Sequence, residues 1–309
     1  MRRRTFVAMA ATSGVSLVAP IRGFARANAD TATAPPGKGV VAGSPPQTGY
    51  APVNGLEMYY EIHGRGEPLV LLHGAYGAIG LWGPILTTLA EHRQVIAVEL
   101  QGHGHTADID RPFDYEHFAD DVAGLMDHLA LAHADVVGYS MGGTTALQVA
   151  IRHPKLVRKL VVIAANYRKD GFYPAVLAGL GALTPEVFAG SPEEEIYLRT
   201  APNPEAFPVL VEKHNALDTL EFAFPDEDMR VIAAPTQLLF GDSDIVRLDH
   251  AVEMFQLRGG GVPGDFVGLP ATQLAILPGT THLTIVSERT DVLVTMIDTF
   301  LAAPMPEGA

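Results

Sequence analysis

From about residue 51 onward, segments with two different patterns of apolar residues alternate along the chain. Short apolar runs bounded by turn residues predict strands, and most are apolar throughout, as buried parallel strands are. These runs lie at 56–62, 68–74, 94–100, 135–139, 159–165, 236–240 and 273–277. Elsewhere apolar residues recur every three or four positions, which predicts helices. The helical segments are 79–92, 115–131, 141–153 and 286–302.

The order of these segments predicts an α/β fold, with a mostly parallel sheet covered by helices on both faces. The alternation stops between 166 and 233, where no strand pattern stands out. Three segments there begin with a capping residue, a proline and an acid: Thr184-Pro185-Glu186, Ser191-Pro192-Glu193 and Asn203-Pro204-Glu205. That order suits a helix start. We therefore expect a helical insertion, here called the helical cap (166–233).

The first 50 residues follow a different pattern. Three arginines precede an apolar run at 6–21, and the small-x-small sequence Ala27-Asn28-Ala29 follows it. This is the plan of a secretory signal, and Arg3-Arg4-Thr5-Phe6-Val7 resembles a twin-arginine export signal. The alternative is an N-terminus that is never cleaved. The apolar run is too short and too interrupted for a membrane span.

From these patterns we expect a periplasmic or secreted protein with no stable membrane span after signal removal. Residues 30–50 are rich in Pro, Gly, Ala and Thr and are interpreted as a linker. The expected division is a signal peptide (1–29), a linker (30–50), a first core part (51–165), the helical cap (166–233) and a second core part (234–309).

Ser140 stands between glycines in Gly138-Tyr139-Ser140-Met141-Gly142, where a predicted strand meets a predicted helix. Two interpretations are open: the serine caps the helix, or it is a nucleophile on a tight strand-to-helix turn. A nucleophilic serine needs a histidine base, an orienting carboxylate and N–H donors for the oxyanion. If Ser140 is a nucleophile, these partners must lie elsewhere in the chain.

The expected partners occur in the order Ser, acid, His. His282 follows the last predicted strand and is the expected base, whereas His250 lies in an ordinary helix pattern. Asp242 and Asp244 both follow the strand at 236–240. Asp244 is favoured because it lies further into the loop. The expected oxyanion donors are the backbone N–H groups of Met141, after the serine, and Ala75, in the loop after 68–72.

Four ordered motifs resemble the α/β-hydrolase fold superfamily. They are His73-Gly74, Gly102-His103-Gly104, Gly138-Tyr139-Ser140-Met141-Gly142-Gly143, and Asp244 followed by His282. The chain looks like the branch of small capped esterases, lactonases and cofactor-free haloperoxidases, over about residues 50–302. The resemblance implies an eight-stranded sheet, a triad of Ser140, Asp244 and His282, and no cofactor.

The chain departs from that family's pattern after the strand at 94–100. Gln101 stands where the family usually has arginine, and Thr106 where it has serine. We expect a different hydrogen-bond network behind the site. The loop at 258–270 is also longer than a minimal connection.

The composition limits the classes of partner that the protein is expected to bind. The 35 acidic and 21 basic residues give a net charge of −14, which argues against nucleic acid. Removing residues 1–29 removes five arginines and makes the protein more acidic. The chain has no cysteine, which excludes disulfides and thiolate ligands. His103, His105, Asp108 and Asp110 superficially resemble a metal site, but their spacing fits no common zinc pattern, so no metal is expected.

The function expected from the sequence is an exported serine hydrolase that cleaves a small-molecule carboxylic ester or lactone. Serine rather than aspartate at the elbow argues against dehalogenase and epoxide-hydrolase chemistry. Two alternatives use the same triad: a cofactor-free perhydrolase or haloperoxidase, and an acyltransferase. A third is a binding protein built on a hydrolase scaffold that has lost its activity.

Overall fold

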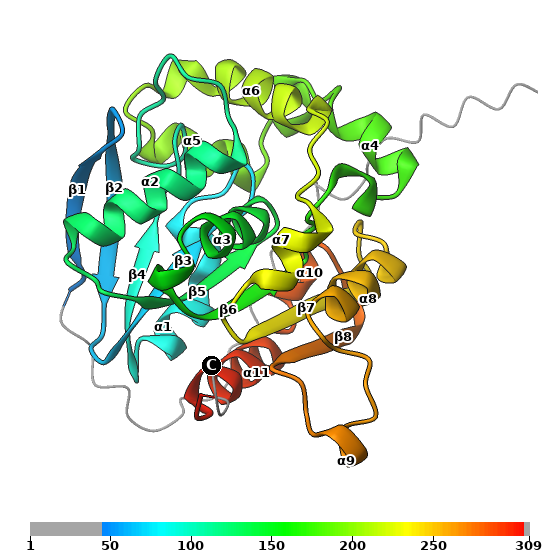
Figure 1. Cartoon of the computed structure of the whole chain (residues 1–309). Helices are drawn as coiled ribbons and strands as arrows, with labels where there is room; N and C mark the ends of the chain where they lie inside the picture. Colours follow the sequence, from blue (N-terminus) through cyan, green and yellow to red (C-terminus); the bar gives the residue numbers. More distant parts are fainter. Residues whose placement is uncertain (1–44, 306–309) are drawn as a thin grey trace, which may run out of the picture. The chain divides into compact units, whose positions relative to one another are not determined.

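An eight-stranded sheet organises residues 45–305, the part of the chain that the computed structural model describes (Figure 1). The expected signal peptide and most of the expected linker lie outside these residues. The strand order is β1-β2-β4-β3-β5-β6-β7-β8. The strands are β1 Gln47–Val53, β2 Leu56–His63, β3 Glu67–Leu72, β4 Arg93–Val98, β5 Ala134–Tyr139, β6 Val157–Ile163, β7 Thr236–Ser243 and β8 Thr272–Thr281.

The sheet is mostly parallel. β3 to β8 run in one direction, and only β1 and β2 pair antiparallel with their neighbours. β5 and β6 are buried along most of their length, which explains their unbroken apolar sequences. The predicted fold class, an α/β architecture with a mostly parallel sheet, is confirmed.

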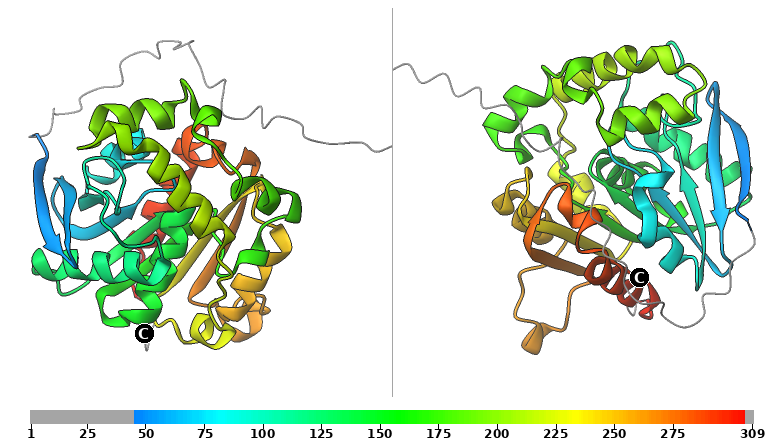
Figure 2. Two further views of the ribbon diagram at one scale, coloured as in Figure 1. Left: turned by 90° about the horizontal axis from the view of Figure 1, so that it is seen from above. Right: turned by 180° about the vertical axis from the view of Figure 1, so that it is seen from behind.

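Helices cover both faces of the sheet (Figure 2). α2 and α3 pack together on one face, and α1 and α11 pack together on the other. A buried cluster that includes Trp82, Leu89 and Ile297 fills the space between the sheet and the second pair. The core helices are α1 Gly83–Leu89, α2 Tyr115–His128, α3 Met141–Arg152, α8 Leu248–Leu257, α10 Thr284–Ser287 and α11 Thr290–Ala302.

The segment between β6 and β7 contains the helices of the cap. They are α4 Pro174–Leu180, α5 Pro192–Thr200, α6 Phe207–Thr219 and α7 Asp226–Val231, with 3-10 turns at Lys169–Gly171, Pro185–Phe188 and Pro204–Ala206. Ser191 caps α5, because its Oγ accepts a hydrogen bond from the Glu194 N–H at 3.3 Å. The three Pro-acid signals therefore mark one α-helix and two 3-10 turns.

Several predicted boundaries differ from the structure. β1 begins at Gln47, inside the expected linker, and a tight turn at Asn54-Gly55 joins it to β2. Both turn residues have positive φ, 47° and 88°, as an Asn-Gly hairpin turn requires. The segment expected to be one helix at 79–92 is a 3-10 turn, Ile79–Trp82, followed by α1.

The last predicted helix also differs, because 286–302 is divided into α10 and α11. The strand predicted at 273–277 continues to Thr281, which brings its end directly to His282. None of the helices within residues 45–305 has both the length and the apolar character that a bilayer crossing requires.

Candidate active site

Ser140 occupies a strained turn between β5 and α3. Its φ of 54° and ψ of −123° lie outside the regions that non-glycine residues prefer. The Ser140 N–H donates to the Ile163 carbonyl at 2.9 Å, and the Ser140 carbonyl accepts from the N–H groups of Gly143 and Thr144. Three backbone bonds thus hold the serine in this conformation at the start of a helix.

Small residues around the serine let three backbone segments meet. A Cβ added to Gly138 would overlap the carbonyl of Gly142, and one added to Gly142 would overlap the carbonyl of Leu72 on β3. A Cβ on Gly143 would lie 2.6 Å from that of Ala165. The glycines are therefore required by packing, and this close packing presses the turn against β3 and the end of β6.

The structure brings Ser140, His282 and Asp244 together. Nε2 of His282 lies 2.9 Å from Oγ of Ser140, and Nδ1 lies 2.8 Å from Oδ1 of Asp244. His282 and Asp244 are both buried, with exposed fractions of 8% and 7%. Each of the three follows the carboxyl end of a parallel strand: β5, β8 and β7 respectively. Parallel strands end at one edge of the sheet, which is why residues so distant in sequence meet there.

Backbone donors fix the carboxylate of Asp244. Its Oδ1 accepts from the Val246 N–H at 3.1 Å, and Oδ2 accepts from the Gly241 N–H at 3.4 Å. The ring of His282 is positioned from the other side, because the Tyr139 hydroxyl donates to the His282 carbonyl at 2.9 Å. Tyr139 was not among the residues predicted to matter. Its place directly before the serine was the only signal in the sequence.

The two rejected residues lie elsewhere. Asp242 is exposed, and its Oδ2 accepts from the Gly279 N–H at 2.9 Å, which lowers the pKa of this carboxyl. His250 is fully buried and stacks on Tyr167, with ring centroids 4.9 Å apart. Within residues 45–305, neither side chain forms a hydrogen bond or ring contact with Ser140 or His282, so the placement agrees with the choice of Asp244 and His282.

The loop after β3 approaches the serine. A Cβ on Gly74 would lie 3.2 Å from that of Ser140, so the backbone around Ala75 is close to the nucleophile. Within residues 45–305, the N–H groups of Ala75 and Met141 form no hydrogen bond to the protein. Two free donors near one serine are what an oxyanion needs.

His73 holds that loop in place. Its Nδ1 donates to the Gly74 carbonyl at 2.8 Å, and its Nε2 accepts from the Leu100 N–H at 3.1 Å. Burial lowers the pKa of His73 to about 4, so the ring is neutral at ordinary pH. A neutral ring is the form that makes both bonds.

A network around Gln101 supplies the cation that the family pattern usually has at that position. The side-chain amide oxygen Oε1 of Gln101 accepts hydrogen bonds from Nε and Nη2 of Arg111 at 2.8 and 2.6 Å. Arg111 also binds Asp121, with Nη1 3.1 Å from Oδ1. The guanidinium therefore comes from the loop after β4. Thr106 donates to the Glu99 carbonyl at 2.7 Å, so the second departure is also accommodated.

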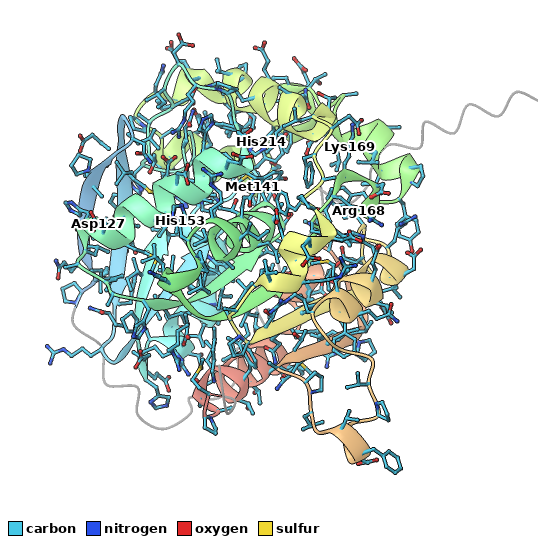
Figure 3. The ribbon with its side chains drawn as sticks, viewed as in Figure 1. Asp127, Met141, His153, Arg168, Lys169 and His214 are labelled. Atoms are coloured by element: carbon cyan, nitrogen blue, oxygen red, sulfur yellow. The ribbon has the colours of Figure 1, made fainter. Side chains whose placement is uncertain are left out.

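The histidines that superficially resembled a metal site have separate partners. His103 Nε2 lies 2.9 Å from Nε2 of His214 on α6, whereas His105 Nδ1 lies 3.0 Å from the Glu99 carboxylate. Asp108 binds Lys213, with Oδ1 2.7 Å from Nζ. His103 and His214 are fully buried, and burial lowers the pKa of both rings. Figure 3 labels His214 above Met141, at the start of α3.

Two further polar groups lie near this region, Asp218 of the cap and Tyr76 of the loop after β3. Asp218 on α6 is partly buried, and burial raises its pKa to about 7, although Lys169 opposes the shift. Tyr76, next to Ala75, lies between Phe188 and His214, with ring centroids 4.5 and 4.2 Å away. Its buried hydroxyl has no hydrogen-bond partner among the described residues. Sequence reasoning missed these groups, because only the docking of the cap places them.

The family model for the α/β hydrolase fold matches residues 67–205. A putative carbamate hydrolase, RutD, of Azorhizobium caulinodans is 34% identical over 123 residues, covering 40% of this chain and 46% of that protein. The pimeloyl-[acyl-carrier protein] methyl ester esterase of Yersinia enterocolitica is 28% identical over 260 residues, covering 75% and 92%. The chain spans about half or less of the length of the first curated relatives it matches.

Solved structures agree on the fold. A meta-cleavage product hydrolase, CumD, from Pseudomonas fluorescens has a TM-score of 0.67 at 21% identity, covering 82% of this chain and 97% of that one. The enol-lactonase of Burkholderia xenovorans has a TM-score of 0.62 at 22% identity, covering 82% and 100%. The α/β-hydrolase fold expected from the sequence is therefore confirmed.

Proposed function

We propose that this α/β-hydrolase-fold protein is a serine hydrolase that cleaves carboxylic esters or lactones. The observation that carries the proposal is the unbroken hydrogen-bonded chain from Ser140 through His282 to Asp244. The esterases, hydrolases and lactonase among its relatives and structural neighbours support the same class of reaction.

In the proposed mechanism each group has one role. His282 Nε2 takes the proton as Ser140 Oγ attacks the carbonyl carbon, and the ester or lactone bond then breaks with return of that proton to the leaving oxygen. Asp244 keeps Nδ1 protonated and stabilises the imidazolium. The N–H groups of Ala75 and Met141 bind the oxyanion. Water, deprotonated by the same histidine, then attacks the acyl-enzyme and releases the acid.

The test compares Ser140→Ala with the wild-type protein on p-nitrophenyl esters of graded chain length and on several lactones. Loss of the nucleophile is expected to reduce kcat by about 10⁵–10⁶-fold. Ser287→Ala is the matched control, because Ser287 is exposed and donates only to the Leu283 carbonyl. Labelling of the wild type by a fluorophosphonate probe, lost only in Ser140→Ala, identifies the nucleophile. A Ser140→Ala variant with full esterase activity would refute the mechanism.

We also propose that the protein is exported by the twin-arginine route. The support is the sequence pattern of residues 1–29, with Arg3-Arg4 before the apolar run. Fractionation of cells that produce the full chain should recover it in the periplasm or medium. Arg3→Lys with Arg4→Lys should retain it in the cytoplasm, whereas Arg22→Lys should not. Equal export of the Arg3/Arg4 variant would contradict the proposed route.

A further inference from the structure

The connection between α8 and β8 exposes several apolar side chains close together. Residues 259–271, here called the α9 projection, carry the short helix α9 Gly264–Val267, which stands away from the sheet (Figure 1). The exposed fractions are 89% for Phe266, 67% for Val267, 92% for Leu269 and 44% for Val262. Single exposed apolar residues are common, but a group of this kind marks a contact surface.

A groove lies directly beside the base of this projection. It has a volume of about 330 Å³ and is lined by side chains of β8 and α11, among them Leu274, Ala275, Met296, Thr299 and Phe300. A cavity of about 150 Å³ holds a benzene ring. The groove therefore has room for the ring of a phenylalanine together with a second apolar side chain.

The buried side of the groove contains an unpaired acceptor. Gln237 is 5% exposed, and its Nε2 donates to Gln273 Oε1 at 3.2 Å. Its own Oε1 is buried and has no partner within residues 45–305. A buried acceptor without a donor is costly, so the groove favours an occupant that brings an N–H group. The backbone N–H of Leu269 forms no hydrogen bond in the described chain.

We propose that the α9 projection of one protomer fills the β8–α11 groove of a second copy, and that the exchange is reciprocal. Leu274 and Ala275 of the groove lie only a few residues after the projection, which ends at residue 271. A two-fold axis between groove and projection therefore places each projection in the partner's groove, as an isologous dimer requires.

The surface involved reaches the lower limit for a specific dimer. Phe266 alone contributes about 150–200 Å² of apolar surface, and the four exposed side chains contribute about 500 Å². The contact occurs twice, so the two projections bury about 1,000 Å², and the walls of the two grooves bring the total to about 1,200 Å², the lower end of the range for specific interfaces.

The position of the projection favours a second copy over a lipid surface. It enters the amino end of β8, whereas His282 follows the carboxyl end of the same ten-residue strand, about 30 Å away. A membrane bound at α9 would therefore face away from Ser140.

Light scattering during gel filtration tests the dimer. We expect the wild-type protein to run as a dimer, and Phe266→Asp with Leu269→Asp to run as a folded monomer with unchanged esterase activity. The matched control is Leu198→Asp on α5, where Leu198 is 49% exposed and far along the chain from the groove. A monomeric wild type, or a dimer that survives the double substitution, overturns the proposal.

Cross-linking tests which surfaces meet, because the chain has no cysteine of its own. Phe266→Cys mixed with Thr299→Cys should form a cross-linked pair with a short bismaleimide, and neither variant should do so alone. A cross-link in Phe266→Cys alone, or one within a single chain that carries both cysteines, refutes the exchange. A vesicle assay tests the membrane alternative. If the wild-type protein sediments with phosphatidylcholine vesicles and Phe266→Asp does not, the projection binds a membrane and the proposed dimer contact is refuted.

Discussion

Asp244→Asn is the sharpest test of the proposed site, because it exchanges one carboxylate oxygen for an NH₂ group and keeps the size and shape of the side chain. The Asp244 Oδ1 accepts from both His282 Nδ1–H and the Val246 N–H. In the amide, an NH₂ donor replaces either Oδ1, which faces His282 and the Val246 N–H, or Oδ2, which faces the Gly241 N–H. If it faces His282, Nδ1 must become the acceptor, and the proton moves to Nε2. An imidazole protonated at Nε2 cannot take the proton of Ser140.

The expected loss in kcat is about 10⁴-fold, the size seen when the wrong tautomer forms in a serine triad. That corresponds to about 5 kcal/mol of transition-state stabilisation. The assay is hydrolysis of a p-nitrophenyl ester under saturating conditions, with thermal unfolding to confirm the fold. KM should change little, since Asp244 does not face the substrate.

Asp242→Asn provides the matched control two residues away. The Asp242 carboxylate is exposed and accepts from the Gly279 N–H, and an amide oxygen can keep that bond. We expect less than about a threefold change in kcat, as for surface substitutions in general. If Asp242→Asn were the more damaging variant, the assignment of the orienting carboxylate would be wrong.

Three further outcomes are expected. Gly142→Ala should abolish activity or folding, because its Cβ would overlap the Leu72 carbonyl; near-normal activity and melting temperature would contradict this. Arg111→Ala should lower the stability by about 3 kcal/mol in urea unfolding, because it removes the guanidinium from the buried Asp121 carboxylate and both donors from Gln101 Oε1. An unchanged urea midpoint would refute the network's role. Asp218→Asn should stabilise the protein increasingly as pH rises from about 4 to 7. The pKa of Asp218 is raised to about 7 in the folded state, so above that pH ionisation of the carboxyl costs the folded protein up to about 4 kcal/mol. Partial exposure of the side chain reduces this cost. A difference in melting temperature between the two proteins that does not depend on pH would contradict this prediction.

The core and the three site residues could be anticipated because their signals are local or ordered. Apolar runs gave the parallel strands, and parallel strands end at one edge. Any polar residue directly after β5, β7 or β8 is therefore a candidate neighbour of the others. Asp242 and Asp244 could be separated only by loop position, and the structure places Asp244 on His282 at 2.8 Å.

What the sequence did not reveal depends on long-range packing. The Asn54-Gly55 turn could have indicated β1, but "QTGYAPV" lacks the apolar run that marked the other strands, since only one side of β1 is buried. Arg111 compensates for Gln101 from ten positions away, which no local pattern records. The contact between His103 and His214 joins segments 111 residues apart and exists only because α6 docks on the loop after β4.

The docking of α6 links these unpredicted groups to the chemistry. His214 meets His103, and both rings are buried and neutral. His103 in turn lies against His73, with ring centroids 4.9 Å apart, and His73 bonds the loop that carries Ala75. A shift of α6 would therefore be transmitted through three neutral rings to a proposed oxyanion donor. The cap therefore contributes, through His214, to the packing that positions the loop carrying Ala75.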